Sequence, residues 1–338
     1  MKAAVLIKQT DASSAFEIRE LPKPAPQGDE VLIKVTASGL NFADVMARKG
    51  MYKEAPPLPC VLGYDVAGVV EAVGTDVKNV KAGDRVTALT RFGGYAEYAV
   101  TKSSAVAAIP VDMDDATATA LTTQYITAYY AAAEAVNLFA GDKVLIQSGA
   151  GGVGTALIQI CKHKGCEIFS TAGSEDKIKH LSSLGVHHPV NYNKDDFALV
   201  IKSLTGGKGV DVIFDAVGGA SVKKGIRSLA AGGRIVCYGA SALTDKNIFG
   251  KIKTALGFGF YHPVMLMMPS KSIIGINMLS IADEKPAVIQ RCLEAVIKLY
   301  NEGVFIPTIS KVFPVNEIGA AHEYLEKRKS IGKVVMKW

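Results

Sequence analysis

Six residues after one apolar run have the types and spacing of a phosphate-binding turn. Gly149, Ala150, Gly151, Gly152, Val153 and Gly154 satisfy G-x-G-x-x-G, follow the run KVLIQS and open the stretch TALIQICKHKG. A second apolar run comes ~20 residues later, which completes the strand, turn, helix and strand of a dinucleotide-binding unit. Glycines let the backbone approach a pyrophosphate, and the helix N-terminus presents N–H groups to it. The alternative is a tight turn without a ligand. The surrounding strand, helix and second strand favour a turn that binds a ligand.

The end of the second apolar run indicates which nicotinamide cofactor binds. NAD enzymes place an acidic residue there against the ribose hydroxyls, whereas this run ends in Ala172, Gly173 and Ser174. Small neutral residues leave room for a 2′-phosphate, and Lys177 in the next helix can neutralise its charge. The pattern therefore favours NADPH. Two alternatives stay open: Glu175 or Asp176 reaches the ribose, or Lys177 is an ordinary surface lysine.

Two patterns of residue types along the chain predict the strands and helices that position this turn. The first ~120 residues are short β-branched runs split by Pro and Gly, which is typical of an all-β domain. An alanine-rich helical stretch follows, and then strands and helices alternate, which predicts a parallel sheet covered on both faces. We therefore expect an α/β protein with a β-rich domain over 1–122 and a doubly wound nucleotide-binding domain over 123–262. Residues 263–338, with the strand KSIIGINML, are expected to return to the first domain.

Composition and charge exclude several classes of protein. The 338 residues are 49% hydrophobic and 21% charged with a net charge of +6, and no basic module suggests nucleic-acid binding. The five cysteines form no C-x-x-C pair or Cys/His cluster, which disfavours a metal site and a disulfide framework. No secretory signal is apparent, so a cytoplasmic protein is expected. The longest apolar stretch, 255–268, is interrupted by His262 and Pro263 and is too short to span a membrane.

Several motifs together carry a family resemblance over essentially the whole chain. They are GLNFAD from Gly39, GYDVAGVV from Gly63, AGDRV from Ala82, GGYAEY from Gly93 and the glycine turn. The chain resembles the medium-chain dehydrogenase/reductase superfamily and, within it, the quinone oxidoreductase family that includes zeta-crystallin. The stretches NFADVMARKGMY, YITAYYAA and HPVNY are most similar to the vesicle amine transport protein-like branch. The resemblance implies a GroES-like catalytic domain, a Rossmann domain, a cofactor between them and a homodimer with KSIIGINML at its edge.

Departures from the zinc-dependent alcohol dehydrogenases then suggest the chemistry. Asn41 stands where those enzymes carry a zinc-binding Cys, and Tyr64 replaces the His of their Gly-His-Glu. Only six residues separate Val86 from Gly93, so the lobe for a structural zinc is missing as well. We therefore predict no metal. Without a Lewis acid, alcohol oxidation loses its main stabilisation, and reduction of an electrophilic acceptor remains.

Conjugate reduction requires a donor for the developing enolate oxygen and a proton source. By resemblance, Asn41 lies near the nicotinamide and holds the ribose or the substrate carbonyl; its alternative role is an Asx turn before a helix. Tyr52 resembles a substrate-facing tyrosine that donates a proton in related reductases, and its alternative is to cap a hydrophobic cluster. Tyr64 either lines the substrate pocket or merely fills the space of the lost metal.

Further candidates are weaker. Thr127 and Tyr192 resemble residues at the nicotinamide and adenine ends of the cofactor, respectively. Val217 and Gly239 end later strands, where a doubly wound sheet presents its ligand. The insert from Lys246 to Ser270, with FGFYHPVMLMM, suits a lid over a flat substrate, a dimer contact or a membrane-surface element.

The leading interpretation is an NADPH-dependent, zinc-free reductase that transfers hydride to a quinone or an enone. One alternative is a reductase of enoyl thioesters, which needs basic residues for a coenzyme A phosphate. The other is a non-catalytic nucleotide-binding protein with a role in trafficking or binding.

Overall fold

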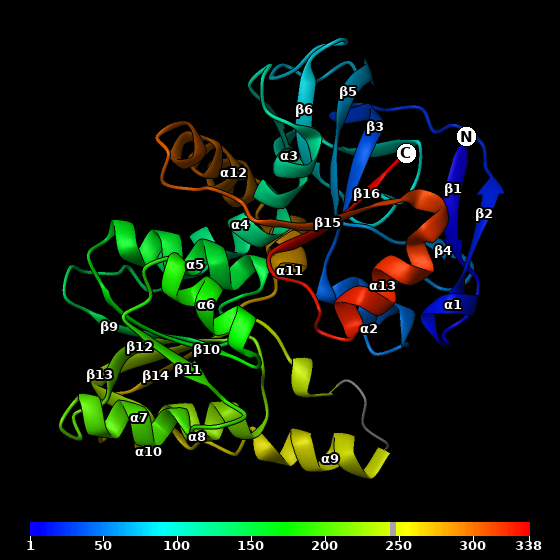
Figure 1. The fold of residues 1–338 in the computed structure, drawn as a ribbon. Coiled ribbons are helices and arrows are strands. Elements are labelled where there is room, and N and C mark those ends of the chain that lie inside the picture. The colour runs from blue at the N-terminus through cyan, green and yellow to red at the C-terminus, as the bar shows by residue number, and fades with distance from the viewer. Residues whose placement is uncertain (244–247) are drawn as a thin grey trace. The chain divides into compact units, whose positions relative to one another are not determined.

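The computed structural model describes residues 1–243 and 248–338, which form two compact units (Figure 1). Unit 1 comprises Met1–Thr127 and Met278–Trp338, and unit 2 comprises Ala128–Asn277. The expected mixed α/β class, a β-rich domain together with a parallel-sheet domain, is confirmed.

Unit 2 alternates strands and helices as the sequence predicts. Its elements are β9 (Lys143–Ile146), α5 (Gly152–His163), β10 (Glu167–Ala172), α6 (Glu175–Ser183), β11 (His188–Asn191), α7 (Phe197–Leu204), β12 (Val210–Asp215), α8 (Ala220–Ser228), β13 (Leu229–Cys237), α9 (Ile248–Gly257), α10 (Pro263–Met267) and β14 (Ser272–Gly275). Two short helices, η2 (Tyr130–Ala135) and η3 (Ser241–Leu243), complete it.

The six strands of unit 2 form one parallel sheet in the order β11-β10-β9-β12-β13-β14. The helices α5 and α6 cover one face and α7 and α8 the other (Figure 1). Both faces are therefore buried, which explains why strands such as VLI and VIF are continuously apolar. The chain runs outward from β9 in one direction and from β12 in the other. This switch point is where doubly wound sheets bind ligands, beyond the carboxyl ends of their strands.

Unit 1 contains two sheets. Its strands are β1 (Lys2–Leu6), β2 (Phe16–Glu20), β3 (Glu30–Leu40), β4 (Cys60–Val61), β5 (Asp65–Val73), β6 (Arg85–Leu89), β7 (Tyr98–Lys102), β8 (Val106–Ala108), β15 (Ile309–Pro314) and β16 (Lys333–Lys337). The smaller sheet has the order β2-β1-β4, and the larger has the order β15-β16-β3-β5-β6-β8 with β7 also paired to β3. The last strand of the chain thus pairs with the long β3 near its beginning.

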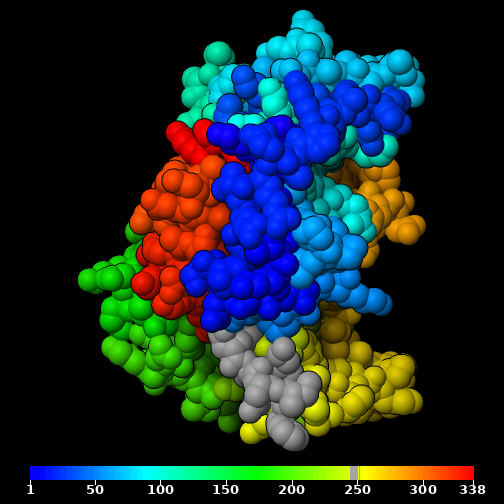
Figure 2. Space-filling model, turned by 90° about the vertical axis from the view of Figure 1, so that its right-hand side faces the viewer, coloured from blue at the N-terminus to red at the C-terminus, as the bar shows by residue number. Residues whose placement is uncertain are grey.

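Short helices surround these sheets. They are α1 (Ala12–Ala15), α2 (Phe42–Arg48), η1 (Ser103–Ala105), α3 (Asp115–Leu121), α4 (Thr123–Tyr129), α11 (Met278–Glu284), α12 (Pro286–Asn301), η4 (Val315–Glu317) and α13 (Ile318–Glu326). The helices α1 and α13 pack together, so the first and last segments of the chain lie side by side (Figure 2).

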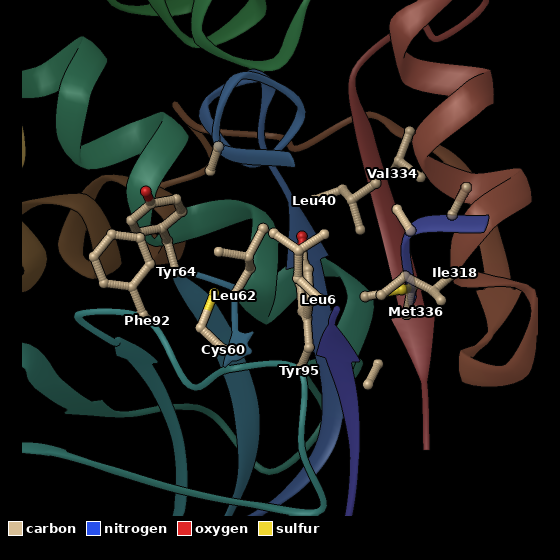
Figure 3. Close-up of a cluster of buried hydrophobic side chains, with 14 of the residues drawn as sticks. Leu6, Leu40, Cys60, Leu62, Tyr64, Phe92, Tyr95, Ile318, Val334 and Met336 are labelled. Atoms are coloured by element: carbon tan, nitrogen blue, oxygen red, sulfur yellow. The ribbon is translucent and has the colours of Figure 1, made fainter. Parts of the chain in front are cut away.

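A cluster of buried side chains joins the early and late segments of unit 1 (Figure 3). Leu6 and Leu40 come from β1 and β3, and Val334 and Met336 come from β16. Burying these aliphatic side chains stabilises the unit by about 1.5–3 kcal/mol each. The same cluster contains Tyr64, which is discussed below.

The boundaries differ from those expected at 122 and 262. Residues 263–277 belong to unit 2, because β14 pairs with β13 and extends the parallel sheet. The expected strand KSIIGINML is also shorter, since helix α11 begins at Met278. Of the insert expected from Lys246, residues 246–247 lie outside the described residues. No helix in the described part of the chain is long and apolar enough to cross a membrane.

Candidate functional site

The glycine turn of unit 2 connects β9 to α5. Its backbone is tied to the neighbouring strand, because the Gly149 N–H donates to the Thr171 carbonyl at 3.0 Å and the Ser148 N–H to the Thr171 hydroxyl at 3.2 Å. Ser148 has a φ of 58°, which turns the chain sharply at the end of the strand. The turn is thus held against β10 before the helix begins.

The glycines of this turn have different reasons to be glycine. A Cβ on Gly149 would lie 1.9 Å from the Ser170 hydroxyl, and one on Gly154 would lie 2.6 Å from the Gly149 Cα. Close packing of the turn against β10 requires Gly149, and close packing of α5 against the turn requires Gly154. A Cβ on Gly151 would meet nothing closer than 3.4 Å, an ordinary contact with the Ser148 carbonyl. The lack of a side chain at Gly151 leaves the backbone open to an approaching group, which fits a pyrophosphate.

The first turn of α5 presents donors at this place. Gly151 is the N-cap and supplies no side-chain acceptor. The N–H groups of Gly152, Val153 and Gly154 therefore have neither an intrahelical acceptor nor a capping side chain. Together with the helix dipole, they make an anion-binding end.

The carboxyl end of β10 brings three predicted cofactor residues together. The Tyr192 N–H donates to the Ala172 carbonyl at 3.1 Å. This hydrogen bond places the Tyr192 ring over Gly173, because a Cβ on Gly173 would lie 2.2 Å from the Tyr192 hydroxyl. Tyr192 is 45% exposed, so one face of the ring is open to a flat partner. Ser174 caps α6 and accepts a hydrogen bond from the Lys177 N–H at 3.4 Å. Gly173, Ser174, Lys177 and Tyr192 thus lie at one edge.

Glu175 is the alternative ribose ligand that the sequence leaves open, and in the structure its carboxylate binds other protein groups. Its Oε1 accepts from the Asn191 amide at 2.7 Å and from the Lys194 ammonium at 2.9 Å. The hydrogen bond from Lys194 holds the pKa of Glu175 below its usual range. Asp176 is exposed and lies 3.9 Å from Lys179 on the same helix. The Glu175 carboxylate is therefore already occupied by protein partners, whereas Asp176 is directed to solvent.

Val217 and Gly239 follow the ends of β12 and β13. The Val217 N–H donates to Asp215 Oδ1 at 2.9 Å, and the same fully buried carboxylate accepts from Gly218 and Ser221. Gly239 packs against the Ala216 carbonyl, 2.7 Å from where its Cβ would be. The two candidates are therefore close together on the other side of the switch point. Asp215, which organises this loop, was not identified from sequence; an acidic residue at a strand end was the available signal.

In unit 1, Asn41 takes part in a fully buried charge network. Its Oδ1 accepts from the Lys333 ammonium at 2.9 Å, and its Nδ2 donates to Asp65 Oδ2 at 2.6 Å. Lys333 also forms an ion pair with Asp65, and both side chains are 0% exposed. The other oxygen of Asp65 accepts from the Thr122 hydroxyl and the Thr123 N–H, each at 2.8 Å. Asn41 therefore retains at most its second amide N–H and one lone pair of its amide oxygen for a ligand.

Asn41 also begins α2, as its alternative role predicted. Its backbone N–H donates to Asp44 Oδ2 at 2.8 Å, and Asp44 Oδ1 accepts from the Gly63 N–H at 3.1 Å. Burial raises the pKa of Asp44 to about 7, although the hydrogen bond from Asn41 opposes this shift. Sequence reasoning assigned no role to Asp44, Asp65 or Lys333. Lys333 is the least predictable of them, because it lies 268 residues after its partner.

Tyr52 and Tyr64 lie near each other, with ring centroids 6.3 Å apart in an edge-to-face arrangement. Tyr52 is partly buried, and this burial, reinforced by Glu54, raises its pKa to about 12. Tyr64 is 3% exposed and packs on Phe92 at 5.1 Å. Its hydroxyl is buried without a hydrogen-bond partner among the described residues. A buried hydroxyl in that state costs about 1–3 kcal/mol.

Thr127 ends unit 1 within α4, and its side chain is directed into its own helix. Its hydroxyl donates to the Thr123 carbonyl at 2.6 Å, and the residue is buried. Within the described residues, no group of three or more His, Cys, Asp or Glu side chains is arranged to hold a metal ion.

Comparisons with known proteins agree with this arrangement. The family model described as alcohol dehydrogenase GroES-like domain matches residues 27–111, and the model described as zinc-binding dehydrogenase matches residues 152–294. The synaptic vesicle membrane protein VAT-1 homolog of Rattus norvegicus is 36% identical over 95% of this chain and 80% of its own length. The quinone oxidoreductase of Homo sapiens is 32% identical over 98% of this chain and 97% of its own.

A solved structure extends the likeness to the fold. A mycobacterial protein in complex with NADPH superimposes with a TM-score of 0.87 at 28% identity, over 100% of both chains. The chain is thus an oxidoreductase-type protein with the two expected domains. It belongs to the medium-chain dehydrogenase/reductase superfamily, in the zinc-independent branch that contains the quinone oxidoreductases and the VAT-1 homologs.

Proposed function

We propose that this protein is an NADPH-dependent reductase that transfers hydride to quinones or α,β-unsaturated carbonyl compounds. The observation that carries the cofactor choice is the end of β10. Small neutral residues occupy it, Lys177 and Tyr192 flank it, and Glu175 is bound to Lys194 and Asn191. A 2′-phosphate suits this surface better than a ribose hydroxyl pair does. The NADPH complex of the mycobacterial relative supports the same choice.

The remaining contacts of NADPH are assigned to residues on the carboxyl edge of unit 2. The N–H groups at Gly152, Val153 and Gly154 would hold the pyrophosphate, with Gly149, Ala150 and Gly151 shaping the turn. Tyr192 would stack on the adenine, and Val217 and Gly239 would line the nicotinamide side of the switch point. When bound, NADPH supplies a hydride equivalent to the acceptor.

Tyr52 is the proposed proton source in unit 1. Addition of hydride to the β-carbon of an enone moves the π electron pair toward the carbonyl oxygen and leaves an enolate. The Tyr52 hydroxyl then gives its proton to the α-carbon and regains one from solvent, since the side chain is only partly buried. A pKa of about 12 keeps this phenol protonated at neutral pH and hence able to donate.

The test is steady-state oxidation of NADPH with an ortho-quinone, a simple enone and crotonyl-CoA, for wild type and Tyr52→Phe. We expect saturable turnover of the quinone and the enone, with enone reduction at least tenfold slower in the variant. Turnover of crotonyl-CoA alone would favour the enoyl-thioester alternative. Tight NADPH binding without turnover of any acceptor would instead favour a nucleotide-binding protein.

We also propose a homodimer formed through unit 2. β14 pairs only with β13 among the described strands and so exposes an unpaired strand edge. Large apolar side chains in the segment that precedes β14 are exposed, among them Phe260 at 84% and Met268 at 77%. Surfaces of this kind are typically covered by a partner. Sedimentation velocity over a concentration series should give twice the chain mass, and a monomer throughout would contradict the proposal.

A further inference from the structure

Tyr64 is held rigidly by the residues on either side of it. Gly63 has a φ of +99°, and a Cβ there would lie 2.5 Å from the Tyr95 ring, so this turn admits only glycine without rearrangement. Asp65 is fixed in the buried network with Lys333. The Tyr64 carbonyl accepts from the Thr90 N–H at 2.7 Å. The backbone at Tyr64 is therefore anchored on both sides.

The Tyr64 ring is fixed as well. It packs on Phe92 and meets the edge of Tyr52, and only 3% of the residue is exposed. In Figure 3 the ring lies beside Phe92, tilted against it, while its hydroxyl points away from Cys60 and Leu62 at the margin of the cluster. A fixed ring holds its hydroxyl in one place, which is the condition for orienting a ligand.

The hydroxyl is the feature that packing does not explain. It is buried and forms no hydrogen bond of good geometry with any of the described residues, although the Tyr52 hydroxyl is near enough to interact with it weakly as an acceptor. Phenylalanine would fill the same space without burying an unpaired donor, so the hydroxyl destabilises the free protein. Burial and the Asp44 charge raise its pKa, so it remains a neutral O–H donor. A role as a mere filler of apolar space accounts for the ring but not for the oxygen.

We propose that the Tyr64 hydroxyl donates a hydrogen bond to the carbonyl oxygen of the acceptor, beside Tyr52. This inference rests on the proposed reductase function and specifies its acceptor as a compound with a carbonyl next to the reacting double bond. The hydrogen bond strengthens as negative charge develops on that oxygen, so it acts mainly in the transition state. Tyr52 and Tyr64 then have separate tasks, proton donation and carbonyl orientation.

The first test compares Tyr64→Phe with Tyr95→Phe, which removes another buried hydroxyl from the same cluster. For Tyr64→Phe we expect unchanged or higher resistance to unfolding, a kcat for enone reduction at least tenfold lower, and a KM changed less than threefold. Tyr95→Phe should keep kcat within twofold. Equal losses in the two variants, or a kcat within twofold in Tyr64→Phe, would overturn the inference.

A second readout does not depend on turnover. The absorbance of 4-(dimethylamino)cinnamaldehyde shifts to the red when its carbonyl accepts a hydrogen bond, so its spectrum reports the donor directly. Wild type should shift it, with or without NADPH, and Tyr64→Phe should abolish most of the shift. A shift in wild type without any turnover would contradict the proposed function but not the donor role. An equal shift in the variant would contradict the donor role even in an active enzyme.

Discussion

Replacing Lys333 by Met should destabilise unit 1 strongly, because it leaves a charge without its partner in the interior. Lys333 and Asp65 are both 0% exposed, and removing one member of such a pair costs about 3–5 kcal/mol. Asp65 keeps its hydrogen bonds from Asn41, Thr122 and Thr123, so the lower end of this range, about 3 kcal/mol, is expected.

The chain carries its own probe for this measurement. Its only tryptophan, Trp338, lies in unit 1 and donates from its indole N–H to the Ser38 hydroxyl at 3.2 Å. Urea unfolding followed by tryptophan fluorescence therefore reports on this unit. The control Lys102→Met removes an exposed lysine paired with Asp29 and should leave the midpoint unchanged.

A double-mutant cycle separates the ion pair from simple loss of packing. Lys333→Met combined with Asp65→Asn removes both charges, so it should be more stable than Lys333→Met alone by at least about 1 kcal/mol. A Lys333→Met variant within about 1 kcal/mol of wild type in stability, or simple additivity of the two substitutions, would contradict a stabilising ion pair.

Three further predictions concern pH, the glycine turn and the cofactor. Burial lowers the pKa of His322 in the folded protein to about 3, whereas a histidine in the unfolded chain has a pKa near 6.5. The folded protein therefore has its full stability above pH 6.5 and loses stability as the pH falls from 6.5 toward 3, because only the unfolded chain binds the proton. Urea unfolding at pH 7.5 and 5.0 should show a loss of about 2 kcal/mol that His322→Phe removes; the same loss in the variant would refute this. Gly149→Ala should lower the melting temperature, measured by calorimetry, because the added Cβ meets Ser170. Gly151→Ala should leave the melting temperature unchanged and weaken NADPH binding, measured by fluorescence titration. The opposite pattern would contradict the roles assigned to these two glycines. Lys177→Ala should raise the KM for NADPH about tenfold without affecting NADH, while Lys179→Ala on the same helix should change neither; equal effects would refute a specific role for Lys177.

Local pattern predicted unit 2 well because its elements are set by short-range periodicity and turn chemistry. Helix α5 follows the glycine turn and covers most of the stretch TALIQICKHKG, and β10 is the second apolar run expected ~20 residues after the turn. The strand near the end of unit 2 was predicted too long. Its apolar run continues through Leu279, but helix formation from Met278 ends it, and apolar runs alone do not separate strand from helix.

The buried network of unit 1 lay beyond sequence reasoning for a different reason. Asn41 stood out by family resemblance, but its partner Lys333 is near the C-terminus and resembles any surface lysine in a basic stretch. Only the pairing of β16 with β3 brings the two together. Likewise, the sequence does not decide whether Tyr64 fills the space of the lost metal or lines the substrate pocket. Its buried hydroxyl, which forms no hydrogen bond of good geometry, favours the second role.

Whether this protein is an NADPH-dependent reductase is tested most directly by the ratio of kcat/KM for NADPH to that for NADH, measured on wild type with an ortho-quinone as acceptor. A charge-assisted contact to the 2′-phosphate predicts a ratio of about 10–100 in favour of NADPH. A ratio near one or below it, or the absence of quinone reduction with either cofactor, would contradict the account.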